Sequence, residues 1–323
     1  MTFYRLLPCL SLALLFPLGQ VRGASYPDTV TNDNPVAYWR LGEAFGSSNA
    51  VDSVGSLTMN VQADVVLGQP GANAGDTDTS AGFPGTPDSF LNRDDWDPEL
   101  NPTEFSVEFL ARPSGGSGTR AAVGSSDYFL ADEIYGYEVG LGTGDVWQFR
   151  TGRGFVFEED AWNILTGSTA ALGAWAHVVA TFDGTNMHLY VDGVSDGALT
   201  NILFTEQTFW ESRIGAGANE MSPPDDFWIG DLDEVSIYDY ALSSTQVQNH
   251  YATLSFDVPE TVVLDIGLAG GLVEVSWTTA NTGAVLQGSA DLLAPPAWTN
   301  IPGASSPYTN ASSNSIKSFR LVE

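Results

Sequence analysis

The clearest pattern of apolar and polar positions lies between Trp175 and Gly193, in the stretch WAHVVATFDGTNMHLYVDG. His177 to Phe182 is rich in β-branched and aromatic residues, and Met187 to Val191 alternates apolar with polar side chains, as half-buried strands do. Between them, Asp183 to Asn186 supplies residues that accept tight turns. The stretch therefore predicts an antiparallel hairpin that defines the fold.

Shorter runs of the same character recur along the chain, separated by Gly, Asp, Pro and Ser. These predicted strands are Val36–Leu41, Phe105–Ala111, Glu138–Leu141, Val146–Arg150 and Leu232–Tyr238. Helical periodicity is scarce and is best between Ser243 and Leu254, where Ser243 or Ser244 is the candidate N-cap. Many short strands with turns between them predict an all-β sandwich or jelly roll over residues 25–255.

The composition changes after this helix. Phe256 to Glu260 has the character of a linker, and the residues beyond it are much less acidic. The predicted strands of this part are Val262–Ile266, Leu272–Trp277, Ala284–Gln287, Trp298–Ile301 and Ser318–Val322. Residues 256–323 therefore predict a small second β-sandwich, close to the minimum size that buries its own core.

The first 23 residues have the features of a secretory signal peptide. Arg5 precedes the apolar stretch Leu6 to Leu18, and small residues precede a cleavage point ahead of Ala24. The stretch is too short to span a bilayer, so we expect a secreted or cell-surface protein without membrane insertion. Cys9, the single cysteine, lies inside this segment. The mature chain is then expected to lack disulfides, a thiolate nucleophile and Cys-ligated metals.

The net charge of −29, with Lys317 as the only lysine, restricts the partners. Such a surface repels the phosphate backbone, so nucleic acid is excluded as a partner, and it also repels anionic membranes. Acidic loops are suited to Ca²⁺, which prefers carboxylate and carbonyl oxygens. The simpler interpretation is that the charge keeps an exported protein soluble.

Five segments match one family in order. They are PVAYWRLGE (35–43), AVDSVGS (50–56), FSVEFLARP (105–113), the hairpin described above and IGDLDEVSIYDYALSSTQVQNHY (229–251). On these segments the block from 25 to 255 resembles the laminin-G-like, concanavalin-A-like jelly-roll domains. The tail resembles short β-sandwich modules at the C-termini of exported bacterial proteins, through VSWTTANTGAVLQGSADL, AWTNIPG, SPYT and FRLV.

The resemblance implies a structural calcium ion, because similar jelly rolls carry Ca²⁺ where the early Asp-Ser loop meets the last strand. Asp52, the Gly55 turn, Asp233 and Glu234 occupy the matching positions. A hard cation needs several oxygens that converge from separate segments. The alternative is that Asp233 caps a turn or pairs with an arginine.

Catalytic motifs are not recognisable. Some enzymes of this fold carry Glu-x-Asp-x-x-Glu on a strand, so that acid and nucleophile share one face. In the nearest stretch, 231–236, Asp231 and Ser236 stand where the two glutamates are required. Gly-x-Ser-x-Gly, phosphate-loop and zinc-protease motifs do not occur in the sequence. Tryptophans that could line a glycan groove are Trp96, Trp147, Trp162, Trp210 and Trp228.

The leading expectation is therefore an exported, non-catalytic recognition or adhesion protein that binds a glycan or an extracellular surface protein. A glycan-cleaving enzyme of concanavalin-A-like fold is the first alternative, and a purely structural cell-surface protein is the second. The sequence does not indicate which residues contact the ligand.

Overall fold

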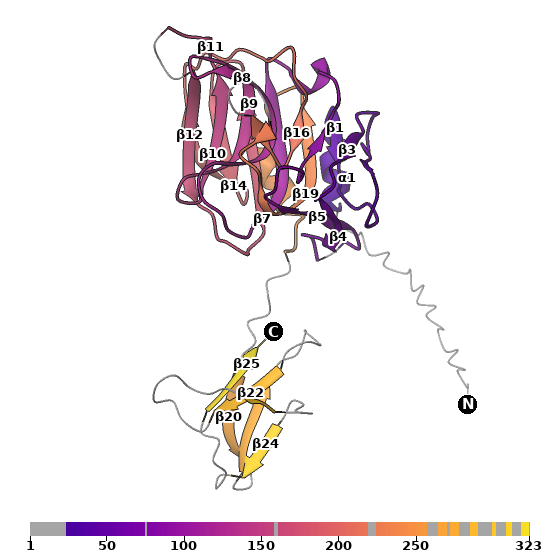
Figure 1. Ribbon diagram of the computed structural model, residues 1–323, viewed down its shortest axis with the longest axis vertical. Helices are drawn as coiled ribbons and strands as arrows, with labels where there is room; N and C mark the ends of the chain where they lie inside the picture. Colours follow the sequence, from indigo (N-terminus) through magenta and orange to yellow (C-terminus); the bar gives the residue numbers. More distant parts are fainter. Residues whose placement is uncertain are drawn as a thin grey trace, which may run out of the picture. The chain divides into compact units, whose positions relative to one another are not determined.

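The computed structural model describes residues 24–74, 76–157, 161–218, 224–256, 264–269, 272–277, 285–289, 299–301, 308–311 and 318–322. The chain divides into two compact units, Met1–Phe256 and Asp257–Glu323 (Figure 1). The predicted signal peptide and most of the predicted linker lie outside the described residues.

The large unit is a sandwich of two antiparallel sheets. The first sheet has the strand order β15-β14-β13-β7-β19-β5-β4, and β1 also pairs with β19. Its strands are β1 Ala37–Trp39, β4 Val66–Pro70, β5 Thr79–Pro84, β7 Phe105–Pro113, β13 Ala176–Phe182, β14 Met187–Val191, β15 Val194–Leu199 and β19 Ile229–Tyr238. The all-β prediction is confirmed, and β14 has the predicted bounds.

The second sheet has the order β12-β10-β9-β8-β16-β6-β3-β2, with β11 paired to β9. Its strands are β2 Asn49–Ala50, β3 Met59–Val61, β6 Leu91–Asn92, β8 Arg120–Leu130, β9 Glu133–Gly142, β10 Val146–Gly152, β11 Gly154–Phe155, β12 Trp162–Thr169 and β16 Arg213–Ile214. A two-stranded hairpin, β17 Gly217–Ala218 and β18 Pro224–Asp225, contacts β8. The sequence patterns did not predict β8 or β12.

The predicted hairpin forms as β13 and β14, with Phe182 opposite Met187. Its turn requires Gly184, which has φ of +85°, in the left-handed region that favours glycine. Asp183 Oδ1 accepts hydrogen bonds from the Thr185 and Asn186 amides at 3.0 and 2.7 Å. The turn residues thus close the hairpin locally, as the sequence predicts.

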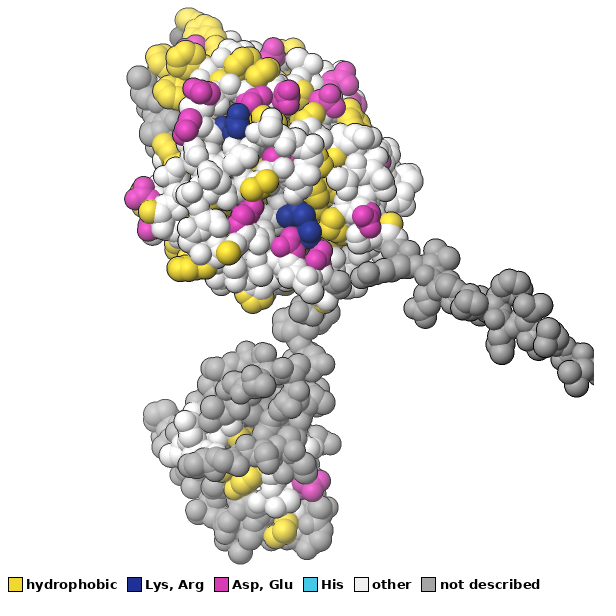
Figure 2. Space-filling view, turned by 90° about the vertical axis from the view of Figure 1, so that its right-hand side faces the viewer, with side chains coloured by type: hydrophobic (Ala, Val, Ile, Leu, Met, Phe, Trp, Pro, Cys, Tyr) yellow, Lys and Arg dark blue, Asp and Glu magenta, His cyan; other side chains and the backbone are white. Residues whose placement is uncertain are grey.

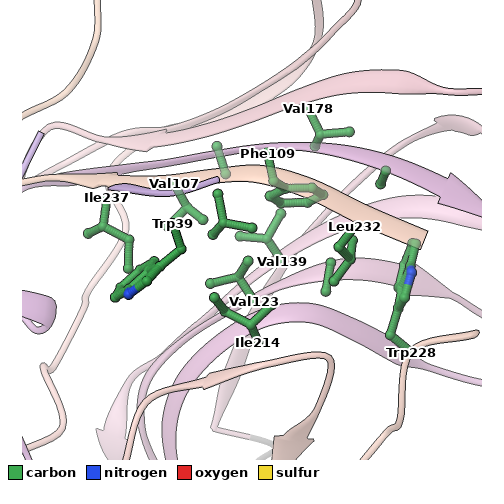
Figure 3. Close-up of a cluster of buried hydrophobic side chains, with 14 of the residues drawn as sticks. Trp39, Val107, Phe109, Val123, Val139, Val178, Ile214, Trp228, Leu232 and Ile237 are labelled. Carbon is green, nitrogen blue, oxygen red and sulfur yellow. The ribbon is translucent and has the colours of Figure 1, made fainter. Parts of the chain in front are cut away.

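The core lies between the two sheets, where alternate side chains of both sheets meet (Figure 3). Trp39 is fully buried there, and its indole donates a hydrogen bond to the Leu57 carbonyl at 2.7 Å. Trp147 and Trp228 are also buried and stack at 6.3 Å between ring centroids. Burial of aromatic side chains of this size supplies a large share of the apolar stabilisation.

Two helices bury the opposite face of the first sheet. They are α1 Tyr26–Asn32 and α2 Ser244–Tyr251, and a 3₁₀ turn, η1, spans Pro98–Leu100. Ser243 caps α2 as predicted, through a capping box with Gln246. The short helix α1 was not predicted, although Ser25 and Asp28 form the same kind of cap.

Glu108 of β7 joins both helices to the sheet. It is fully buried and accepts hydrogen bonds from the hydroxyls of Tyr26 and Tyr238, at 2.9 and 2.8 Å. Its oxygens also lie 2.7 Å from Nε2 of His177 and 2.9 Å from Nδ1 of His250. The carboxylate therefore ties α1, α2 and three strands into one buried polar network.

The small unit contains two three-stranded sheets, β20-β21-β24 and β23-β22-β25. Its strands are β20 Leu264–Ala269, β21 Leu272–Trp277, β22 Val285–Ser289, β23 Thr299–Asn300, β24 Tyr308–Ala311 and β25 Ser318–Val322. Val275 and Leu286 are buried in its core, with Tyr308 and Phe319 packed against them. The fold prediction of a second small β-sandwich is confirmed.

Candidate functional site

Asp52, the first predicted calcium ligand, closes its own turn. Its Oδ1 accepts hydrogen bonds from the amides of Tyr38 and Val54, and its Oδ2 accepts one from Leu57 at 3.0 Å. Gly55 is needed for close approach, since a Cβ there would lie 2.6 Å from Asp52 Oδ2. The Asp-Ser-x-Gly loop is thus held by backbone donors.

Asp233 and Glu234 lie where β19 changes its neighbour. The first half of β19 pairs with β5 and the second half with β1, and Glu234 at the junction has φ of +54°. Asp233 Oδ2 accepts a hydrogen bond from the Ala72 amide at 2.8 Å, whereas its buried Oδ1 has no hydrogen-bond partner. Burial, and next the charge of Glu234, raise the pKa of Asp233 well above its ordinary value.

Arg40 neutralises this junction. Its Nη2 lies 2.8 Å from Glu234 Oε1, 2.6 Å from Asp76 Oδ2 and 2.9 Å from Asp78 Oδ2. Burial raises the pKa of Glu234, although the hydrogen bond and charge of Arg40 oppose that rise. Asp233 thus accepts a hydrogen bond from the distant Ala72 amide, and the arginine partner at this junction belongs to Glu234.

Two of the four predicted calcium ligands, Asp52 and Glu234, are already engaged within the chain. Asp52 is saturated by backbone amides, and Glu234 is held by Arg40 and the Tyr38 hydroxyl. Among the described residues, no group of three or more His, Cys, Asp or Glu side chains is placed to hold a metal ion. At the junction of β1, β5 and β19 the positive charge comes from a guanidinium.

The structure sorts the candidate tryptophans into two groups. Trp147 and Trp228 belong to the core and cannot contact a ligand. Trp96 and Trp210 are each 36% exposed, and Trp162 is partly exposed at the start of β12. Trp162 is the one that lies among polar groups on an outer sheet face.

The candidate site is the outer face of the second sheet at β12, β10 and β9. Along β10, Trp147 and Phe149 point into the core, so Gln148 and Arg150 point outward. The guanidinium of Arg150 lies over the Trp162 ring, 5.1 Å from its centroid. Tyr128 of β8 meets the same indole edge-on at 6.5 Å, across the two intervening strands.

Glu138 of β9 holds the Arg150 guanidinium in place. Its Oε2 lies 2.6 Å from Arg150 Nη2, and its Oε1 accepts hydrogen bonds from Ser126 Oγ at 2.8 Å and the Ala218 amide at 2.9 Å. Gly217 permits the contact, because a Cβ there would lie 2.6 Å from Glu138 Oε1. The β17–β18 hairpin therefore forms one wall beside Arg150.

Asp226, which follows β18, completes the site. Its Oδ2 lies 3.0 Å from the same Arg150 nitrogen, and its side chain is 29% exposed. Burial, then the charge of Glu138, raise its pKa. The residue has φ of +49°, a strained conformation for a side chain other than glycine. A partly exposed carboxylate, a guanidinium and an indole thus converge on one surface.

Two carboxylates on one surface raise the question of glycoside hydrolysis. Glu138 is 1% exposed and is held by three donors, so it cannot approach a substrate as acid or nucleophile. The carboxylates of the stretch 231–236 are also either paired or buried. Asp231 pairs with Arg112 at 2.8 Å, and Asp233 and Glu234 are buried.

Sequence reasoning identified Trp162 as a candidate but did not identify Arg150, Glu138, Asp226 or Tyr128. One signal was available, because the predicted strand Val146–Arg150 alternates and so places Gln148 and Arg150 on one face. The pairing of that face with β12 and with the β17–β18 hairpin depends on strand order, which the sequence pattern does not give.

The architecture is that of a concanavalin-A-like jelly roll, and comparison with known families agrees. The profile Laminin_G_3, of the concanavalin A-like lectin/glucanases superfamily, matches residues 87–248, which is slightly more than half of the chain. The chain belongs to this superfamily. The matched residues include β8, β9, β10 and β12, which carry the candidate site.

Two solved structures to which this chain is similar are distant in sequence. The binding domain of Paraclostridial Mosquitocidal Protein 1 has a TM-score of 0.54 and 12% identity, over 88% of this chain and 69% of that one. Domain 4 of an extracellular arabinanase from Geobacillus stearothermophilus, in complex with arabinotriose, has a TM-score of 0.46 and 20% identity, over 67% and 98%. The first supports the fold, and neither identifies a ligand here.

A search of curated proteins gave no match. Within the described residues, every helix is too short or too polar to cross a membrane.

Proposed function

We propose that this protein is an exported, non-catalytic recognition protein whose large unit binds a neutral glycan at the outer face of β12, β10 and β9. The observation that carries the proposal is the Trp162 indole fixed against Arg150, with Tyr128 at its edge and Asp226 beside it. Export rests on the signal-peptide pattern of the first 23 residues.

The chemistry of the surface is suited to a sugar. A pyranose or furanose ring offers a C–H face that packs on an indole, and its hydroxyls pair with a carboxylate and a guanidinium. A net charge of −29 repels sulfated or uronic-acid chains, so a neutral glycan is favoured. Membership of a superfamily of lectins and glucanases supports the same class of ligand.

A glycan array with two tryptophan variants tests the proposal. Trp162→Ala should weaken binding about tenfold, equivalent to about 1.4 kcal/mol, because the stacking surface is lost. Trp175→Ala is the matched control, since Trp175 is also partly exposed and packs under an arginine, Arg112, at 5.0 Å. It lies just before β13 of the other sheet and should bind normally.

Three outcomes would contradict the proposal. One is the absence of binding to a broad panel of neutral glycans by folded protein, which would favour a structural role. Another is an equal loss in both variants, which would place the ligand elsewhere. Release of reducing sugar from a polysaccharide panel would overturn the non-catalytic assignment.

A further inference from the structure

One end of the large unit carries a concentration of exposed apolar side chains. We call it the apical face and define it by these residues: Trp96, Phe129, Leu130, Phe155, Phe157, Leu203, Phe209 and Trp210. Phe155 is 60% exposed, Phe157 76%, and Phe209 72%. Single exposed apolar side chains are ordinary, whereas a group of them on one part of a surface is typical of an interaction site.

Hydrogen bonds join the loops of this face. The Val156 amide donates to the Asp132 carbonyl at 2.8 Å, so β11 lies against the β8–β9 turn. Asn163 at the start of β12 donates to the Leu203 carbonyl at 2.8 Å. Trp96 donates to the Gln207 carbonyl at 3.1 Å. These contacts link the segments that carry the exposed residues, and Figure 1 shows β11, one of these segments, at one end of the sandwich.

Gln207 holds part of this face rigid. It is fully buried, and its Oε1 accepts hydrogen bonds from the amides of Phe209 and Trp210 at 2.9 and 2.8 Å. Its Nε2 donates to Ser125 Oγ at 3.0 Å and to the Trp210 carbonyl at 2.7 Å. The buried Gln207 amide therefore holds two exposed aromatic residues in one position. Such preorganisation reduces the entropy cost of binding a partner.

The charges around the apical face select the partner. Asp94 and Asp95 precede Trp96, Asp132 lies in the β8–β9 turn, and Glu133 begins β9. Arg93, in the same loop as Trp96, is paired with Asp97 at 3.3 Å. Figure 2 shows apolar and acidic side chains together at the upper end of the large unit.

We propose that the apical face docks a basic amphipathic polypeptide segment, with aliphatic or aromatic side chains set between lysines or arginines. Apolar contact with the phenylalanines and charge complementarity with the acidic rim would act together. Anionic membranes and a second copy of this acidic chain are disfavoured by like charge. This surface adjoins the glycan site but uses different residues, since Phe129 follows Tyr128 in β8 and Asn163 follows Trp162 in β12.

The test uses a fluorescent synthetic peptide of Leu and Lys, about 18 residues long and amphipathic as a helix, with the full exported chain. Phe155→Ser combined with Phe157→Ser should weaken its binding at least tenfold. Phe45→Ser is the matched control, because Phe45 is 81% exposed in the loop between β1 and β2. A peptide of Lys and Ser with the same charge should bind weakly and equally to all three proteins.

The outcomes separate the possible occupants. Equal binding of the Leu-Lys peptide to all three proteins, or no binding, overturns the proposal. Self-association in sedimentation that the double variant abolishes would assign the face to a second copy instead. Binding to zwitterionic vesicles that the same variant abolishes would assign it to lipid. Glycan binding should be unchanged in the double variant, and unchanged circular dichroism would confirm its fold.

Discussion

Arg40 shows how one side chain replaces an expected ion. Its guanidinium contacts Glu234, Asp76 and Asp78, which come from two separate segments, and so connects β1, the loop before β5 and β19. Arginine suits this role because its planar group offers several donors at fixed angles and stays charged. The positive charge at the expected calcium position is thus supplied by an arginine side chain of the protein itself.

Arg40→Gln should therefore destabilise the large unit. Removal of one partner from a buried ion pair costs about 3–5 kcal/mol, and we expect the lower end because Arg40 is 28% exposed. The free energy of unfolding in urea measures the effect. Arg112→Gln is the control, since within the described part of the chain Arg112 has one salt-bridge partner, Asp231 at 2.8 Å, and its loss should cost less.

The same experiment should be run in calcium and in chelator. We expect the wild-type unfolding midpoint to be equal in both, because the oxygens of Asp52 and Glu234 are already engaged. A higher midpoint in calcium would restore the calcium hypothesis and show that Asp233 has other ligands in solution.

At the scale of elements, the attachment of α1 and α2 depends on titratable groups. His250 of α2 lies between Glu108 of β7 and Asp33 at the end of α1, with Nε2 2.9 Å from Asp33 Oδ2. Burial lowers the pKa of His250, but hydrogen bonds and charges from Glu108 and Asp33 outweigh it and raise the pKa above 6.5. Tyr26, Tyr238 and His177 surround the same carboxylate.

The stability of the large unit should consequently fall on both sides of a mildly acidic optimum. The His250 contribution is complete below its ordinary pKa of 6.5 and is lost as pH rises through the raised folded value. Burial raises the pKa of Glu108, but His177 and His250 outweigh it, so the folded pKa lies below 4.5. That contribution is complete above 4.5 and is lost as pH falls.

Urea unfolding measured from about pH 4 to pH 9 checks this prediction. His250→Gln should flatten the alkaline limb, whereas His188→Gln, which changes a partly exposed histidine of β14, should leave the curve unchanged. An alkaline limb that persists in His250→Gln would assign the pH dependence to another group.

At the scale of the whole molecule, the charge of −29 acts on every part of the surface. Self-repulsion of like charges destabilises a compact state, and salt screens it. We therefore expect the thermal midpoint to rise as NaCl increases to about 0.1 M, where the Debye length is about 10 Å. The dependence should disappear near pH 4.1, the sequence pI. A midpoint that falls with salt at neutral pH would show that local ion pairs such as that of Arg40 dominate.

The sequence by itself determined the features that depend on neighbours along the chain. The β13–β14 hairpin follows from alternation and from the turn at Gly184, and α2 begins at its cap, Ser243. Both are local because strand alternation and capping need only residues a few positions apart. The helix α1 has a comparable local signal, since Ser25 and Asp28 form its capping box.

Only the tertiary structure decided what the side chains do. Trp147 and Trp162 lie in adjacent strands of one sheet, yet the first is buried in the core and the second faces outward beneath Arg150. Asp233 and Glu234 resemble calcium ligands in sequence. In the structure they accept hydrogen bonds from Ala72 and Arg40, which are more than 150 residues away. A side chain's burial and partners depend on which strands become neighbours, and strand order is a property of the folded chain.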